Sequence, residues 1–205
     1  WNKQVGEFVV EDCEGKQIFY TTANGNIITP PTADLGANLI GNVYENGQGI
    51  MTFDGPVTKM AGFSDCATLT SITIPESVTS VGGACFKNCP KLTSIIWNAK
   101  RVVQIKWGGG TWLGASLPAY DMFEGVRSQI TSFVFGESVE YIPDYLCYCM
   151  EKLTSVVVPN NVTAIGGGVF KGCTSLTYAK LSDQITDMPY LRTGDSGGFR
   201  LPISA

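Results

Sequence analysis

The sequence predicts a β-rich solenoid, in which one chain winds through stacked coils around a shared core. Three observations predict it: an internal repeat with a period of 23 residues, a change of periodicity within each copy, and apolar columns that match between copies. A length of 205 residues allows one domain or two small ones, and the repeat favours one.

The repeat is clearest in LTSITIPESVTSVGGACFKNCPK (69–91) and LTSVVVPNNVTAIGGGVFKGCTS (153–175), which share most framework positions. Copies of this pattern, the last one partial, start at residues 49, 69, 92, 130, 153 and 176. The copy that starts at residue 92 runs for 38 residues instead of 23, so it carries an insertion near residues 106–124. We therefore expect a solenoid of about six coils over residues 49–190.

Each coil is expected to contain one short strand followed by a turn. Apolar and polar residues alternate over residues 71–74, which predicts a strand with Ile72 and Ile74 inward, and Pro75 ends it. The next apolar residues recur at a spacing of three, which suits 3₁₀-like turns: Val78 and Val81, then Phe86 and Cys89. Parallel strands are expected at 71–74, 94–97, 132–135, 155–158 and 178–181, and Met51 and Phe53 head their inward column.

The motif LTSITIP-x₂-VTSVG-x₃-F-x₂-C resembles the BspA-like class of bacterial leucine-rich repeats from about Gly49 to Met188. Residues 18–55 also resemble the segment that precedes such repeats. The resemblance implies a leucine-rich-repeat solenoid: a right-handed superhelix with short parallel strands, turns and 3₁₀-like segments. It also implies a protein that is secreted or attached to the bacterial surface and binds host matrix proteins or other cells.

Residues 1–48 depart from the repeat and are expected to form a small N-terminal β cap. Two hairpins are expected there, one joining 8–10 to 18–20 and one joining 18–20 to 27–28 through Asn24-Gly25. Such a cap would cover the open end of the solenoid. Residues 191–205 are expected to form a C-terminal tail.

Several function classes are excluded by composition. A net charge of −4 without a Lys/Arg cluster argues against nucleic acid and membrane lipid as partners, and no apolar run is long enough for a transmembrane segment. Histidine is absent, so Gly194–Gly198, which spells the serine-protease motif GDSGG, lacks its base. We expect no enzyme activity, no catalytic residue and no cofactor.

Seven cysteines do not follow the paired Cys-x₂-Cys spacing of zinc sites, so we expect no metal. Most are expected to be reduced and buried, because one repeat column contains Cys66, Cys89 and Cys173 together with Val126 and Met150. A disulfide between Cys66 and Cys89 remains an alternative, because adjacent coils lie within the Cα separation that a disulfide needs.

The candidate binding surface is the outward face of the strands, where Ile96, Val134 and Val157 would form an apolar ladder. Its other candidate residues are Ser71, Thr73, Tyr178 and Lys180. Strand propensity explains the β-branched residues about as well. In the insertion, Trp107, Trp112 and Tyr120 either recognise a partner or pack on the flank of the solenoid.

These observations together favour a non-catalytic recognition or adhesion module. Its partner would be an extracellular protein or glycan on a host or neighbouring cell, and its location the bacterial cell surface. The alternative is a structural spacer within a larger surface protein.

Overall fold

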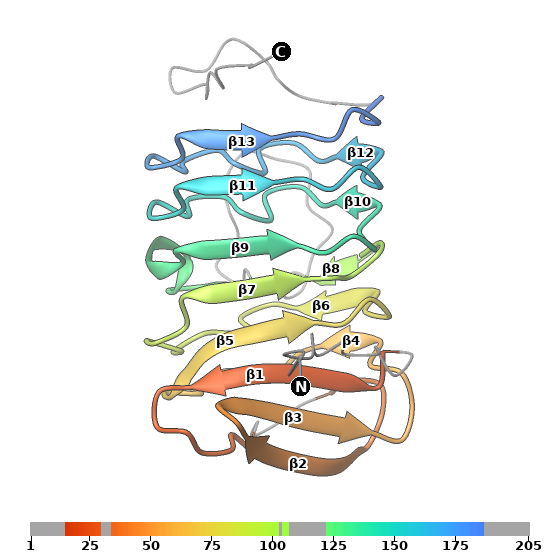
Figure 1. Ribbon diagram of the computed structural model, residues 1–205, viewed down its shortest axis with the longest axis vertical. Helices are drawn as coiled ribbons and strands as arrows, with labels where there is room; N and C mark the ends of the chain where they lie inside the picture. Colours follow the sequence, from red (N-terminus) through yellow and green to blue (C-terminus); the bar gives the residue numbers. More distant parts are fainter. Residues whose placement is uncertain (1–14, 30–33, 103, 107–121, 187–205) are drawn as a thin grey trace, which may run out of the picture.

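Short parallel strands stack along one side of the chain and form a solenoid (Figure 1). The computed structural model describes residues 15–29, 34–102, 104–106 and 122–186. The stacked strands are β5 (Leu69–Ile74), β7 (Ser94–Trp97), β9 (Ser132–Phe135), β11 (Ser155–Val157) and β13 (Tyr178–Lys180). Strands β5, β7 and β9 pair in parallel, as do β11 and β13, and β11 lies beside β9. The expected parallel strands are therefore confirmed.

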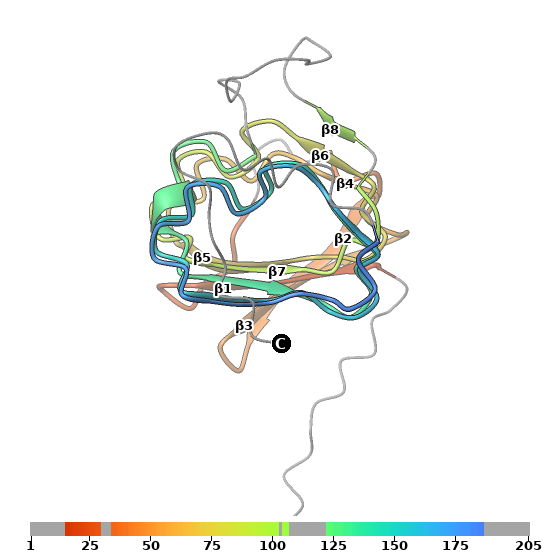
Figure 2. The same ribbon diagram turned by 90° about the horizontal axis from the view of Figure 1, so that it is seen from above.

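A second series of short strands lines the opposite side of each coil, so that the coil closes into a ring when seen along the solenoid axis (Figure 2). Its members are β4 (Lys59–Met60), β6 (Ser80–Gly82), β8 (Gln104–Lys106), β10 (Tyr141–Ile142) and β12 (Ala164–Ile165). They pair in parallel as β4-β6-β8 and β10-β12. Within the described residues, regular 3₁₀ helix is confined to η1 (Arg127–Gln129), and other corners are single turns.

The core lies between these two series of strands. Trp97 is fully buried and Phe135 is 5% exposed, so the inward strand column is confirmed. At one corner Phe63, Phe86 and Phe123 stack from coil to coil, with ring centroids 5.9 and 5.6 Å apart. Pro75 follows β5 directly, as expected for a residue that cannot donate to the sheet. Stacking thus gives each coil the apolar neighbours that it lacks alone.

The N-terminal cap continues the same sheet. It contains β1 (Gln17–Thr22), β2 (Leu39–Glu45) and β3 (Gln48–Phe53), and the order of the six-stranded sheet is β2-β3-β1-β5-β7-β9. Strand β1 runs antiparallel to both β3 and β5. It therefore covers the open edge of β5 with backbone hydrogen bonds, and the cap extends the sheet instead of sitting on top of it.

Two expectations about this end are corrected by the strand pairing. Met51 and Phe53 face inward, but they do not head the parallel column, because β3 is antiparallel to β1 and is separated from β5 by it. Ile27 and Ile28 form no strand, because both edges of β1 are taken by β3 and β5. A tight turn at Asn46-Gly47 joins β2 to β3, whose first residue is Gln48.

Residues 8–10, most of the insertion (107–121) and the tail (191–205) lie outside the described residues.

Candidate functional site

An apolar row crosses the outer face of the sheet at right angles to the strands. Thr73 lies opposite Ile96, and Ile96 lies opposite Val134. Val157 follows Val134 by one repeat of 23 residues and pairs with Lys180. Ile96, Val134 and Val157 are 37%, 50% and 52% exposed. The structure thus brings these candidate residues onto one face, in line.

The row continues into the cap, which sequence reasoning missed. Val43 on β2 lies opposite Ile50 on β3, and Ile50 lies opposite Phe19 on β1. Phe19 precedes Tyr20, which pairs with Ile72, so the antiparallel register places Phe19 beside Thr73. The turn signal Asn46-Gly47 could have revealed this extension, because it aligns β2 with β3.

A second row beside the first consists of hydroxyl groups. Ser71 lies opposite Ser94, and Ser94 lies opposite Ser132. On the cap side Thr21 Oγ1 is 2.6 Å from Ser71 Oγ, and at the far end Ser155 pairs with Tyr178, which is 51% exposed. The outer face is therefore striped, with aliphatic side chains in one row and hydroxyls in the next.

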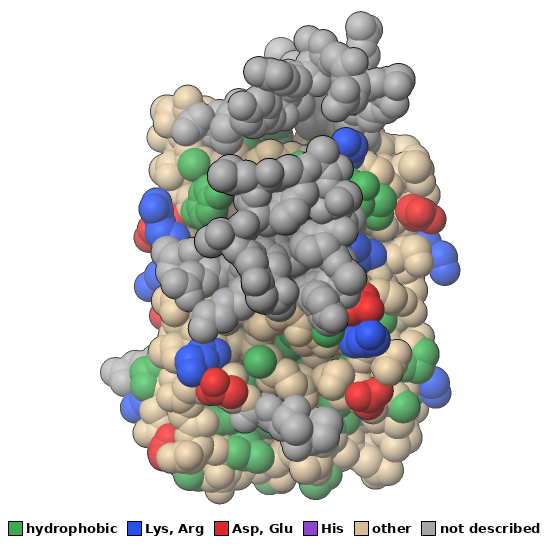
Figure 3. Space-filling view, turned by 180° about the vertical axis from the view of Figure 1, so that it is seen from behind, with side chains coloured by type: hydrophobic (Ala, Val, Ile, Leu, Met, Phe, Trp, Pro, Cys, Tyr) green, Lys and Arg blue, Asp and Glu red, His purple; other side chains and the backbone are tan. Residues whose placement is uncertain are grey.

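Charge is absent from the middle of this face. On β1, β5, β7, β9 and β11 the outward positions carry no ionisable side chain, and Lys180 on β13 is the first charge met along the rows. The opposite side carries acidic and basic side chains (Figure 3). Ion pairs such as Lys59–Asp34, at 2.9 Å, and Lys100–Glu76, at 3.3 Å, join neighbouring segments. Such exposed pairs add little stability each.

Three apolar residues of the cap are exposed outside this row. Ile27, Leu39 and Ile40 are 51%, 47% and 66% exposed. Ile40 lies at the irregularity where the pairing of β2 with β3 shifts between Leu39 and Gly41. This β-bulge interrupts the edge of the sheet.

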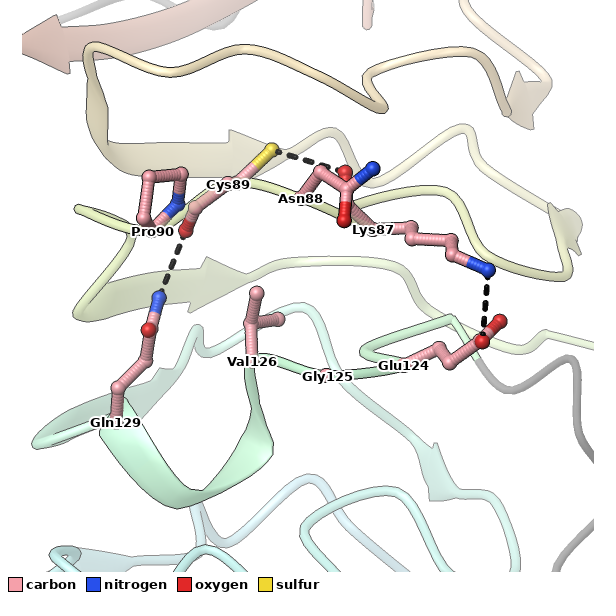
Figure 4. Close-up of a pocket in the computed structure, with 8 residues that line it drawn as sticks. All are labelled: Lys87, Asn88, Cys89, Pro90, Glu124, Gly125, Val126 and Gln129. Carbon is pink, nitrogen blue, oxygen red and sulfur yellow. Dashed lines mark hydrogen bonds and ion pairs between the residues drawn. The ribbon is translucent and has the colours of Figure 1, made fainter.

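A hollow of about 240 Å³ lies between residues 87–90 and residues 124–129, which end and follow the insertion (Figure 4). Lys87 Nζ lies 2.9 Å from Glu124 Oε1 across it. Gln129 Nε2 donates to Cys89 O at 2.7 Å and to Leu92 O at 2.8 Å, which ties the chain that follows the insertion to the chain that precedes it. The hollow therefore contains one Lys–Glu ion pair and one glutamine amide whose hydrogen bonds go to two backbone carbonyls.

The described cysteines are free thiols, and all except the half-buried Cys149 are buried: Cys66, Cys85, Cys89, Cys147 and Cys173. Burial raises the pKa of Cys85 to about 12 and that of Cys173 to about 11. Burial is thus confirmed for five of these six cysteines, while Cys149 is half-buried and Cys13 lies outside the described residues. The part of the chain that the structure describes contains no cluster of three metal-ligating side chains.

Trp107, Trp112 and Tyr120 lie outside the described residues, so their role stays a prediction. Across the described ranges, no helix has both the length and the apolar character to span a bilayer.

Comparison with known proteins identifies the repeat. A family model described as "BspA type Leucine rich repeat region", in six copies, matches residues 58–107 and 119–191. The match covers more than half of the chain. No curated protein matches.

Solved structures are similar over part of the chain. A leucine-rich cell surface protein from Faecalibacterium prausnitzii A2-165 shares 27% identity over 62% of this chain and 30% of its own, with a TM-score of 0.43. A leucine-rich repeat protein from Bacteroides ovatus ATCC 8483 shares 24% identity over 62% of this chain and 28% of its own, with a TM-score of 0.44. The chain thus spans less than a third of either protein.

Proposed function

This chain belongs to the BspA-type leucine-rich-repeat family, and on that premise we propose that its outer sheet face is a non-catalytic recognition surface. The partner is an extracellular protein or glycan on a host or neighbouring cell, and the location is the bacterial surface or the extracellular medium. Solenoid sheets present long, regular surfaces of this kind to partners.

The observation that carries the proposal is the apolar row on an uncharged face. Ile96, Val134 and Val157 expose a third to a half of their surface, although a threonine fills the same column in β5. Each would add buried apolar area in a complex, worth about 25 cal/mol per Å². Because the outward positions of β7, β9 and β11 carry no charge, a partner can cover Ile96 and Val134 without desolvating an ion, and Lys180 lies opposite Val157 at the end of the row.

The composition of the rows favours a protein over a glycan. The outward positions of β5, β7 and β9 offer aliphatic groups and single hydroxyls, and lack the aromatic rings on which sugars stack. Along the two rows, the aromatic residues are Phe19 in the cap and Tyr178 on the last strand, β13. In the insertion, Trp107, Trp112 and Tyr120 are proposed as a second contact set on the basis of their residue types alone.

A capture experiment with a matched variant tests the proposal. The intact chain is immobilised and exposed to solubilised host matrix and surface proteins, and in parallel to a glycan array. The variant Ile96→Thr/Val134→Thr/Val157→Thr removes the apolar row but uses the residue that the chain already places in this column at Thr73. Its fold should persist, because threonine also favours strands.

We expect specific retention by the wild type, and loss of retention by the triple variant at an unchanged melting temperature. Retention on the glycan array alone would replace the protein partner by a sugar. If wild type and variant retain the same material, or neither retains any, the face is not a recognition surface and the structural spacer becomes the better account.

A further inference from the structure

Cys66 and Cys89 occupy the same position in adjacent coils, 23 residues apart. Two hydrogen bonds fix their register: Asp65 N donates to Lys87 O at 2.8 Å, and Asn88 Nδ2 donates to Asp65 Oδ1 at 2.8 Å. Segments paired in this way lie about 4.8 Å apart, within the Cα separation of about 4.4–6.8 Å that a disulfide requires. The backbone geometry therefore permits a bond between the two side chains.

The two thiols also lie close together, since each is the largest influence on the pKa of the other. Cys89 Sγ donates to Phe63 O at 3.1 Å. Cys66 is 7% exposed and Cys89 is fully buried. The third cysteine of this column, Cys173, instead donates to the carbonyl of Cys147 at 3.0 Å.

We propose that Cys66 and Cys89 form a site of reversible disulfide formation that staples the first repeat coil to the second. The structure holds both residues as thiols. The oxidant is a disulfide, either of low molecular weight or in a thiol–disulfide oxidoreductase, as found in oxidising compartments.

The exchange proceeds in two balanced steps. One cysteine thiolate attacks a sulfur of the oxidant, whose S–S bond breaks and releases one thiol. The other cysteine, as thiolate, then attacks the protein sulfur of the mixed disulfide and releases the second thiol. The two cysteines lose two electrons to the oxidant, and their two protons end on the two released thiols.

Cys85 is the other thiol nearby that could form a disulfide with Cys66 or Cys89, but its reactivity is low. It is buried, and burial raises its pKa to about 12, so it forms little thiolate. The hydrogen bond from Cys66 acts in the opposite direction on Cys89 and lowers its pKa. Cys89 is therefore the preferred attacking residue, and Cys66 is the thiol that lies ready to resolve the mixed disulfide.

Because both thiols are buried, the exchange needs the coil to open, and it is fastest while the chain folds. The test is therefore a refolding experiment on the whole chain, with glutathione and glutathione disulfide in one sample and a phosphine reductant in the other. Free thiols are alkylated, and the peptides are mapped by mass spectrometry. We expect a linked peptide pair that contains Cys66 and Cys89, and a melting temperature about 5 °C or more above that of the reduced sample.

The column itself supplies the control variants. Cys66→Val repeats Val126, and Cys89→Met repeats Met150, both of which are buried in the same column. Either variant should fold and melt at the same temperature in both redox buffers. Recovery of alkylated Cys66 and Cys89 from the oxidised, folded wild type, or linkage of Cys89 to another cysteine, would overturn the proposal.

Discussion

The Tyr20 hydroxyl donates a hydrogen bond of 2.7 Å to Asn42 Oδ1 and thereby joins β1 to β2 across the intervening strand β3. The same hydroxyl accepts from Ile28 N at 3.3 Å, and Asn42 Nδ2 donates to Ile28 O at 2.8 Å. A closed ring of three hydrogen bonds thus holds the cap together beneath the buried Tyr20 ring.

Gly49 on β3 leaves the space through which the Tyr20 side chain passes over β3 to reach β2. A Cβ atom at Gly49 would lie 2.1 Å from Tyr20 Cζ, so Gly49→Ala should displace the ring and destabilise the chain by about 1–3 kcal/mol. Gly41→Ala on β2 is the matched control, since its nearest neighbour would be Thr52 Cβ at 3.8 Å. Urea unfolding measures both free energies, and equal losses would refute the crossing role of Gly49.

The Tyr20 phenol should make stability depend on pH in the alkaline range. Burial raises its pKa above the ordinary value of about 10, so the unfolded chain loses this proton first and stability falls as pH rises through that range. Tyr20→Phe lacks this proton. The stability advantage of the wild type over Tyr20→Phe should therefore shrink between pH values of about 9 and about 11. A constant difference in denaturant midpoint would contradict this.

Cys149 has a left-handed backbone conformation, and the other coils place Asp, Asn or Gly, which adopt this conformation more easily, at the same position. The column has positive φ throughout: Asp65 at 60°, Asn88 at 58°, Gly125 at 75°, Cys149 at 53° and Gly172 at 80°. Cys149→Gly should relieve left-handed strain of about 1–2 kcal/mol, less about 0.5–1 kcal/mol of unfolded-chain entropy, for a net gain of about 0.5–1 kcal/mol.

The control for this change is Cys147→Gly, two residues away and fully buried, which should destabilise by leaving a cavity. Thermal unfolding of the two variants measures both effects. If Cys149→Gly melts below the wild type, the backbone strain at this position is not the dominant cost.

Gln129 is expected to hold the solenoid together where the insertion interrupts it. Its amide donates to both Cys89 O and Leu92 O, so Gln129→Glu would turn a carboxylate toward two carbonyl oxygens. We expect a loss of about 2–3 kcal/mol. Ser128→Glu adds the same charge at the exposed neighbouring position and should be nearly neutral. Similar melting temperatures for both variants would show that Gln129 is not a tie between coils.

The repeat made the solenoid predictable, because each copy shows the same periodicity. A position that is ambiguous in one copy can be assigned from the equivalent positions in the others. Ile72, Ile95 and Phe133 share a column, so their common inward direction follows from the sequence alone. The candidate face followed for the same reason, since outward residues alternate with inward ones. Whether that face binds a partner remains a proposal.

The cap was less predictable, because it occurs once and depends on pairing between distant segments. Strand β1 pairs with β3 and β5, which begin some 30 and 50 residues after it, and no local pattern selects these partners over Ile27-Ile28. Asn24-Gly25 and Asn46-Gly47 carry the same turn signal, yet the second alone joins two paired strands. Tertiary pairing, not turn propensity, decided between them.

The most direct test of the recognition face is the affinity of the captured partner for a chain with one charge in the middle of the apolar row. Val134→Glu places a carboxylate at a half-exposed position on the uncharged face, and Thr163→Glu places one at an exposed position before β12. Calorimetric titration should show binding at least about tenfold weaker for Val134→Glu and unchanged for Thr163→Glu. Equal affinity of Val134→Glu and wild type would contradict the account.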